Sequence, residues 1–198
     1  MENRGKPLGN DKDKGRQTRW SARQLAIMSI FTALGVLLSF LELPLFPPAA
    51  ASAITYDPSN IPAMLGGFAY GAGPGSIIGI LSAIIHGLLK GNPVGAAMNI
   101  IGVVGFVVPA ALICRKNRKS NARLITGLVV GGLVSTALMI LSNFAAFPLF
   151  FGIPFSETPA TLIPMILPIL VPFNLLKVLV NGVFSFVLYK SLYKLLER

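Results

Sequence analysis

The stretch that decides the fold is IGVVGFVVPAALIC-RKNRKSNAR-LITGLVVGGLV, residues 101–134. It joins two apolar runs of helical length, 95–114 and 122–146, through a loop that holds five basic residues and no acid. An apolar run of about 20 residues can cross a bilayer as a helix. Basic residues collect in the loops on the cytoplasmic side of a membrane. The stretch therefore predicts two membrane spans that are joined on the cytoplasmic side.

The rest of the chain repeats this pattern. Four further apolar runs have the same character, at 24–41, 59–72, 75–90 and 168–189. Six spans put both termini and the loop 115–123 on one side, where fifteen of the seventeen Lys and Arg residues fall. The run 59–72 is the shortest and contains Pro62 and two glycines, so a hairpin that does not cross the membrane is its alternative. We predict an all-α integral membrane protein, a bundle of six transmembrane helices with cytoplasmic N- and C-termini.

Composition supports a membrane protein. Hydrophobic residues make up 54% of the 198 residues and charged residues 12%, whereas a soluble domain has about 25% charged residues. In a soluble protein, a net charge of +10 would suggest that the protein binds nucleic acid. Here the basic residues fall at one predicted membrane face, so they indicate the orientation of the chain in the membrane instead. Residues 1–20 are predicted to form a disordered basic cytoplasmic tail, and 21–198 the six-helix membrane domain. The run 24–41 is too long for the core of a cleaved signal peptide.

Two of the predicted outer loops, about 42–58 and 147–167, are long, apolar and rich in proline. Water-exposed loops are usually polar, so we expect these apolar loops to fold back over the outer end of the helix bundle. A plug over the bundle and a lid over a binding pocket are equally compatible with the sequence. Prolines spaced four apart predict that the sixth helix starts late, near Pro168 or Pro172.

Polar residues mark one face of the sixth helix. Asn174, Lys177 and Asn181 are three and four residues apart, and Ser185 continues the stripe. An ionisable group within the bilayer is costly, so Lys177 is a functional-site hypothesis. Its alternative is a side chain that extends to the outer headgroups. The neighbouring asparagines favour a pocket wall.

Other polar and small residues leave alternatives open. Asn143 and Asn99 could face the same cavity or bond a neighbouring helix. We do not expect a metal site at His86, because the local spacing brings no second ligand near it. Small residues at Ala22, Ala26, Ser29 and Ala33 lie on one face of the first helix. They either pack within the bundle or dock another membrane subunit.

The chain lacks the motifs of several active sites. It has no P-loop G-x-x-x-x-G-K-[ST], no H-E-x-x-H and no G-x-S-x-G. We therefore expect no enzyme and no cofactor, and favour a binding or transport subunit that depends on partners for energy. The alternatives are an assembly subunit without a ligand and a membrane enzyme that acts on lipid headgroups through Lys177 and the acids of the apolar outer loops, Glu42, Asp57 and Glu157.

Four segments resemble a known family: ELPLFP at 42–47, YDPSNIPA at 56–63, GGFAYG at 66–71 and PFNLLK at 172–177. Together they resemble the substrate-binding (S) components of energy-coupling factor (ECF) vitamin transporters, and above all the riboflavin-specific branch. The resemblance covers about residues 22–195. It implies the six-helix S-component bundle, with an outward-facing pocket that the first outer loop covers.

The resemblance also implies a function. Riboflavin would be the captured and transported ligand, its flavin ring near Asn143, Asn174 and Lys177, with Asn99 as a further candidate. The ribityl chain would meet the first loop around Ile54, Thr55 and Tyr56. The stripe Ala22, Ala26, Ser29 and Ala33 would dock the membrane T subunit, through which two cytoplasmic ATPases supply energy. The protein would lie in a prokaryotic plasma membrane, and an S component for another vitamin is the alternative.

Overall fold

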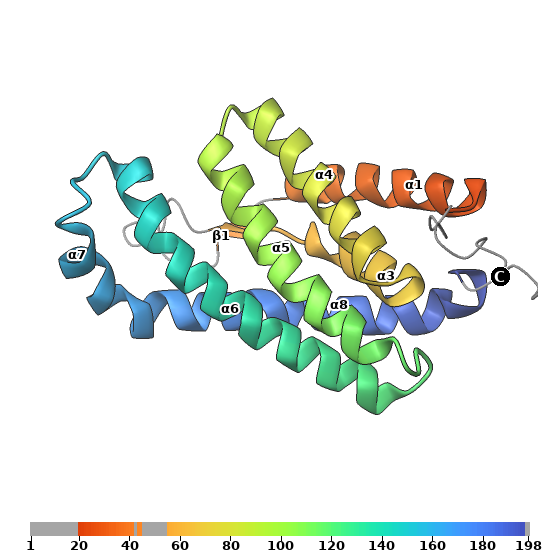
Figure 1. Ribbon diagram of the computed structural model, residues 1–198. Helices are drawn as coiled ribbons and strands as arrows, with labels where there is room; N and C mark the ends of the chain where they lie inside the picture. Colours follow the sequence, from red (N-terminus) through yellow and green to blue (C-terminus); the bar gives the residue numbers. More distant parts are fainter. Residues whose placement is uncertain (1–19, 42, 45–54, 197–198) are drawn as a thin grey trace, which may run out of the picture.

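The computed structural model describes residues 20–41, 43–44 and 55–196. The described chain is helical apart from one short strand pair and the connections, and Figure 1 shows the helices packed as one bundle. The elements are α1 (Ala22–Ser39), β1 (Leu43–Pro44), β2 (Thr55–Tyr56), α3 (Asn60–Tyr70), α4 (Ala72–Lys90), α5 (Pro93–Cys114), α6 (Asn121–Phe151), α7 (Thr158–Met165), the π-helical turn η2 (Ile166–Leu170) and α8 (Val171–Leu196).

Five helical segments in the described part of the chain are long and apolar enough to cross a membrane. They are 22–39, 72–90, 93–114, 121–151 and the continuous stretch 158–196. Their outer surfaces carry many exposed Leu, Val, Ile and Phe side chains, as a surface in contact with lipid requires. The predicted all-α membrane bundle is therefore confirmed.

Helix α3 differs from the predicted second span. It has only 11 residues, which corresponds to about 16 Å of helix against a hydrocarbon core of about 30 Å. Every residue from Asn60 to Ala69 is buried, because α1, α4, α5 and α8 all pack against it. Helix α3 thus completes the predicted bundle of six helices, but it lies at the centre of the core and is shorter than the five membrane-length segments.

Glycine allows α3 to pack so deeply. A Cβ atom added at Gly75 of α4 would lie 2.6 Å from the Cα of Gly67 in α3, so the two backbones touch where the helices cross. Large side chains fill the space around this crossing, among them the fully buried Phe68, Ile78 and Tyr189. The contact fixes α3, and with it the residues just before its first turn.

The predicted loop 147–167 is wrong in its extent. Helix α6 continues to Phe151 and α7 starts at Thr158, so only residues 152–157 connect them. Helix α8 starts at Val171 with Pro172 in its first turn, as predicted, although the helical backbone is continuous from Thr158. Pro168 lies within the π-helical turn and Pro172 in the first turn of α8. A π-turn lets a helix accommodate lost donors without ending.

The strand pair and residues 57–59 position the start of α3. Strands β1 and β2 pair antiparallel, with Leu43 opposite Tyr56 and Pro44 opposite Thr55. The chain then passes from β2 through residues 57–59 into α3. Residues 45–54, most of the predicted lid, lie outside the described part of the chain.

Candidate functional site

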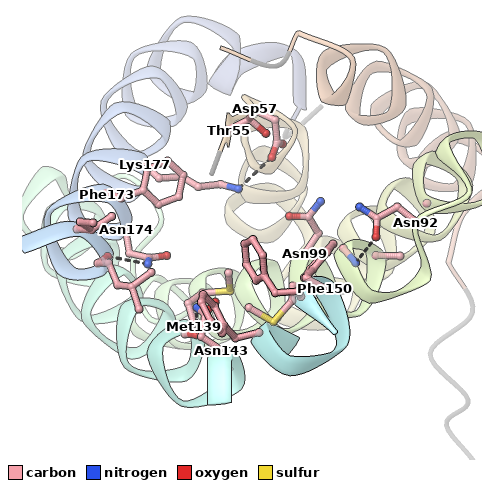
Figure 2. A pocket seen from close by; sticks show the side chains of 18 of the residues that line it. Thr55, Asp57, Asn92, Asn99, Met139, Asn143, Phe150, Phe173, Asn174 and Lys177 are labelled. Atoms are coloured by element: carbon pink, nitrogen blue, oxygen red, sulfur yellow. Dashed lines mark hydrogen bonds and ion pairs between the residues drawn. The ribbon is translucent and has the colours of Figure 1, made fainter. Parts of the chain in front are cut away.

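A cavity of about 750 Å³ opens between α4, α5, α6, α7, α8 and the end of β2. This volume lies within the range of about 300–1,000 Å³ that is typical of small-molecule sites. Figure 2 shows side chains from several of these elements around it. The residues that line it are Thr55, Asp57, His86, Gly87, Lys90, Asn92, Gly95, Ala96, Met98, Asn99, Met139, Asn143, Phe147, Phe150, Phe151, Leu162, Met165, Ile169, Leu170, Phe173, Asn174 and Lys177.

One side of the lining is apolar and aromatic. The C-terminal turns of α6 contribute Phe147, Phe150 and Phe151, and α8 contributes Phe173. Phe147 and Phe151 contact each other with ring centroids 4.5 Å apart. Methionines from α5, α6 and α7 complete these walls. Flexible thioethers and flat rings suit a flat, largely apolar ligand.

The strongest polar feature is an ion pair. The Nζ of Lys177 donates to Oδ2 of Asp57 at 2.9 Å, and the two side chains are only 12% and 8% exposed. Figure 2 shows the pair bridging α8 and the segment before α3. An ammonium has three donors, and the pair uses one of them. Lys177 therefore does not extend to the headgroups as a lone cation, which was the alternative to a pocket wall.

Asp57 is held as a carboxylate. Its Oδ1 accepts from the backbone N–H of Ser59 at 3.0 Å and also from the hydroxyl of Ser59. Burial would raise the pKa of Asp57, but the Lys177 charge and the hydrogen bonds from Ser59 and Lys177 outweigh it and hold the pKa below its ordinary value. The carboxylate thus joins the start of α3 to α8 in its charged form.

Three predicted asparagines reach the cavity. Asn143 donates its amide to the Met139 carbonyl at 2.7 Å, and Asn174 donates to the Leu170 carbonyl at 2.8 Å. These bonds fix each side chain while its amide oxygen stays available to accept. Asn99 also lines the cavity, and among the described residues its amide forms no hydrogen bond.

Of the three residues predicted from loop 42–58 to meet the ligand, two lie in the described part of the chain, and one of these lines the cavity. Thr55 lines the cavity, and Ile54 lies outside the described residues. Tyr56 is absent from the lining. It is 6% exposed, and its hydroxyl donates to Oδ1 of Asn181 at 3.1 Å. Burial, followed by the Asp57 charge, raises the pKa of Tyr56 to about 12. In a strand neighbouring residues point to opposite sides, so Thr55 and Tyr56 could not both face one pocket.

Three residues of the cavity were not predicted as site residues: Asp57, His86 and Lys90. Asp57 had appeared only as an acid in an apolar loop, and no local spacing links it to Lys177, 120 residues later. His86 and Lys90 lie one turn apart at the end of α4, and both line the cavity. The rings of His86 and Phe40 contact each other edge to face. The ammonium of Lys90 lies 5.7 Å from the centre of the Phe40 ring.

The small-residue face of α1 is open. Ala22, Ala26, Ser29 and Ala33 are all exposed, whereas Met28, Phe31, Thr32, Gly35 and Ser39 form the buried face. The stripe therefore does not pack within the bundle, which was one of its two interpretations. Docking of another membrane subunit remains a prediction.

The fold and the site define a multi-pass membrane protein with a ligand-sized cavity between its helices. The chain belongs to the family of ECF transporter substrate-specific components, whose family model matches residues 23–189. It is 31% identical over 180 residues to "Riboflavin transporter RibU" of Staphylococcus aureus (strain TCH60), covering 89% of this chain and 93% of the relative. It is 28% identical over 177 residues to "Riboflavin transporter FmnP" of Bacillus subtilis (strain 168), covering 85% and 91%.

A solved structure has the same fold. The chain matches the structure described as "Structure and mechanism of the S component of a bacterial ECF transporter" with a TM-score of 0.73 and 27% identity. The match covers 89% of this chain and 98% of the other. The resemblance drawn from the four sequence segments is therefore confirmed. The family and the named relatives are transporter components, not enzymes.

Proposed function

We propose that this chain captures riboflavin in the cavity between α4 and α8 and serves as the substrate-specific subunit of an ECF importer. Family membership supports the importer, and the names of the two relatives support the vitamin. The observation that carries the proposal is one polar wall of the cavity, where Lys177, Asn174 and Asn143 meet aromatic residues.

The chemistry of that wall fits the edge of a flavin ring. The pyrimidine edge of isoalloxazine presents two carbonyl acceptors with one N–H donor between them. Lys177 has donors left over from its bond to Asp57, and the amide oxygens of Asn143 and Asn174 are free to accept the N–H. The rings of Phe147, Phe150, Phe151 and Phe173 would bury the apolar part of the ring system. Thr55, at the end of loop 42–58, would meet the hydroxylated ribityl chain.

A titration tests the substrate. Riboflavin fluorescence is recorded as purified protein in detergent is added, with thiamine and biotin as competitors. We expect quenching that saturates at one riboflavin per chain and that neither competitor reverses. Asn143→Leu and Asn174→Leu should each weaken binding, while Asn121→Ala, at the start of α6 outside the cavity, should not. Displacement by another vitamin would assign the cavity to that vitamin and overturn the riboflavin proposal.

The remaining parts of the proposal concern the assembly. The exposed stripe Ala22, Ala26, Ser29 and Ala33 would contact a membrane T subunit, since small side chains let helices approach closely. Two ATPase subunits would supply energy through that subunit, because this chain carries no P-loop. The protein would lie in a prokaryotic plasma membrane with its basic clusters toward the cytoplasm. Riboflavin would be cargo, so no cofactor is required.

A further inference from the structure

Two successive residues attach the segment before α3 to α8. Asp57 pairs with Lys177, and Tyr56 donates to Asn181, which lies one helical turn further along α8. Only the first of these bonds lies at the cavity, since neither Tyr56 nor Asn181 lines it. The bond between Tyr56 and Asn181 lies in the buried core.

Asn181 is poorly explained by packing. It is fully buried, at 0% exposure, and its Nδ2 has no hydrogen-bond partner within the described part of the chain. The Oγ of Ser185, one turn further along α8, is equally buried and also lacks a described partner. A buried amide with an unpaired donor destabilises a core relative to an apolar residue of similar size. The bond that Asn181 does make, to the Tyr56 hydroxyl, is therefore where its contribution lies.

The geometry points to Tyr56 and Asn181 as positioning residues for the ligand site. Their bond fixes the register of β2 against α8, so that Asp57 meets Lys177 and Thr55 faces the cavity. Without it, the Asp57–Lys177 pair would be the only side-chain bond described between the segment before α3 and α8, and the pair would be held less firmly at the cavity wall. This inference rests on the proposed riboflavin function only for its binding readout.

The ligand test compares dissociation rates. Tyr56→Phe removes one hydroxyl and keeps the ring, and we expect riboflavin to dissociate about 2- to 10-fold faster, the range that corresponds to one net hydrogen bond. Asn181→Leu should give the same increase, and the double variant no more than either single one, because both remove the same bond. Additive increases would overturn the inference.

A matched control separates positioning from stability. Tyr189 of α8 is also fully buried, and its hydroxyl donates to the Phe68 carbonyl of α3, but it does not line the cavity. Tyr189→Phe should lower the melting temperature without changing riboflavin dissociation. If Tyr56→Phe lowers only the melting temperature in the same way, its role is structural and the inference fails.

A second readout needs no riboflavin. Thr55→Cys is labelled with a membrane-impermeant maleimide in ligand-free protein, alone and combined with Tyr56→Phe or Tyr189→Phe. Thr55 is half-buried and Cys114 is buried, so slow labelling is expected at first. Loss of the Tyr56 bond should speed labelling of Cys at position 55 several-fold, and loss of the Tyr189 hydroxyl should not. Equal rates in all three proteins would overturn the inference even if riboflavin proves to be the wrong ligand.

Discussion

Lys177 of α8 and Asp57, the residue that follows β2, form a buried ion pair of 2.9 Å on the cavity wall. The pair joins a helix to a loop end 120 residues away in sequence. It therefore holds the segment that leads into α3 against α8 at the cavity wall.

Lys177→Met should weaken riboflavin binding by about 10- to 150-fold. This range corresponds to the loss of one hydrogen bond from a charged donor. The measurement is the fluorescence titration in detergent. Leu179→Met is the control, because Leu179 is 61% exposed on the same helix and lies outside the cavity lining. Equal affinity of Lys177→Met and the unmodified protein would remove Lys177 from the site.

The same substitution should also destabilise the fold, because it leaves the Asp57 carboxylate buried without its cation. Breaking one partner of a buried pair costs about 3–5 kcal/mol, whereas replacing both is far less harmful. Thermal unfolding of the ligand-free protein should therefore rank Lys177→Met below the double variant Asp57→Asn/Lys177→Met. A double variant that is less stable than Lys177→Met would contradict the pairing.

Stability should fall in acid through Asp57. Its pKa is lower in the folded protein than the value of about 3.9 in an unfolded chain, so the folded state gains stability wherever Asp57 is ionised. That gain is complete above about pH 4 and is lost as the pH falls through the lowered folded pKa. Melting temperatures from pH 7 down to 3 should drop for the unmodified protein and stay flatter for Asp57→Asn. Glu157→Gln, at an exposed position, should follow the unmodified protein.

Ala26→Trp should prevent assembly with the T subunit and leave riboflavin affinity unchanged. Ala26 is exposed on α1, outside the cavity, so a large ring there blocks close helix approach without touching the ligand. Co-purification with a tagged T subunit measures assembly. Val129→Trp is the matched control, because Val129 of α6 is 57% exposed and lies outside the cavity lining. Normal assembly of Ala26→Trp would assign the small stripe to the lipid surface.

Gly75→Ala should destabilise the protein by about 1–3 kcal/mol, the usual cost of overpacking. Its Cβ would lie 2.6 Å from backbone atoms of Gly67, which cannot move aside as a side-chain end can. Gly73→Ala is the control, because nothing lies within 4 Å of a Cβ at that position. Thermal unfolding compares the two variants. Equal stability would show that α3 and α4 are not in backbone contact.

The helical bundle could be predicted from the sequence, because apolar runs mark the helices that cross a membrane and basic loops mark its cytoplasmic side. The stripe of Asn174 and Lys177 was also visible, since residues three and four apart share a helix face. The apolar run 59–72 predicted helix α3, but its burial at the centre of the bundle could not be predicted, because a core helix and a membrane helix are equally apolar. The loop 147–167 was overextended because proline suggested helix ends where the backbone forms a π-turn.

Long-range pairs could not be predicted. Nothing near Asp57 in sequence indicates Lys177, and nothing near Tyr56 indicates Asn181. Both pairs form because α3 packs against α8 in the core, a contact that only the folded chain reveals.

The most direct test is the absorption spectrum of the protein purified from cells grown with riboflavin. We expect a yellow protein whose flavin bands correspond to about one flavin per chain, and a Lys177→Met variant that loses most of this colour during purification. A colourless, folded, unmodified protein that also takes up no added riboflavin would show that riboflavin is not the ligand.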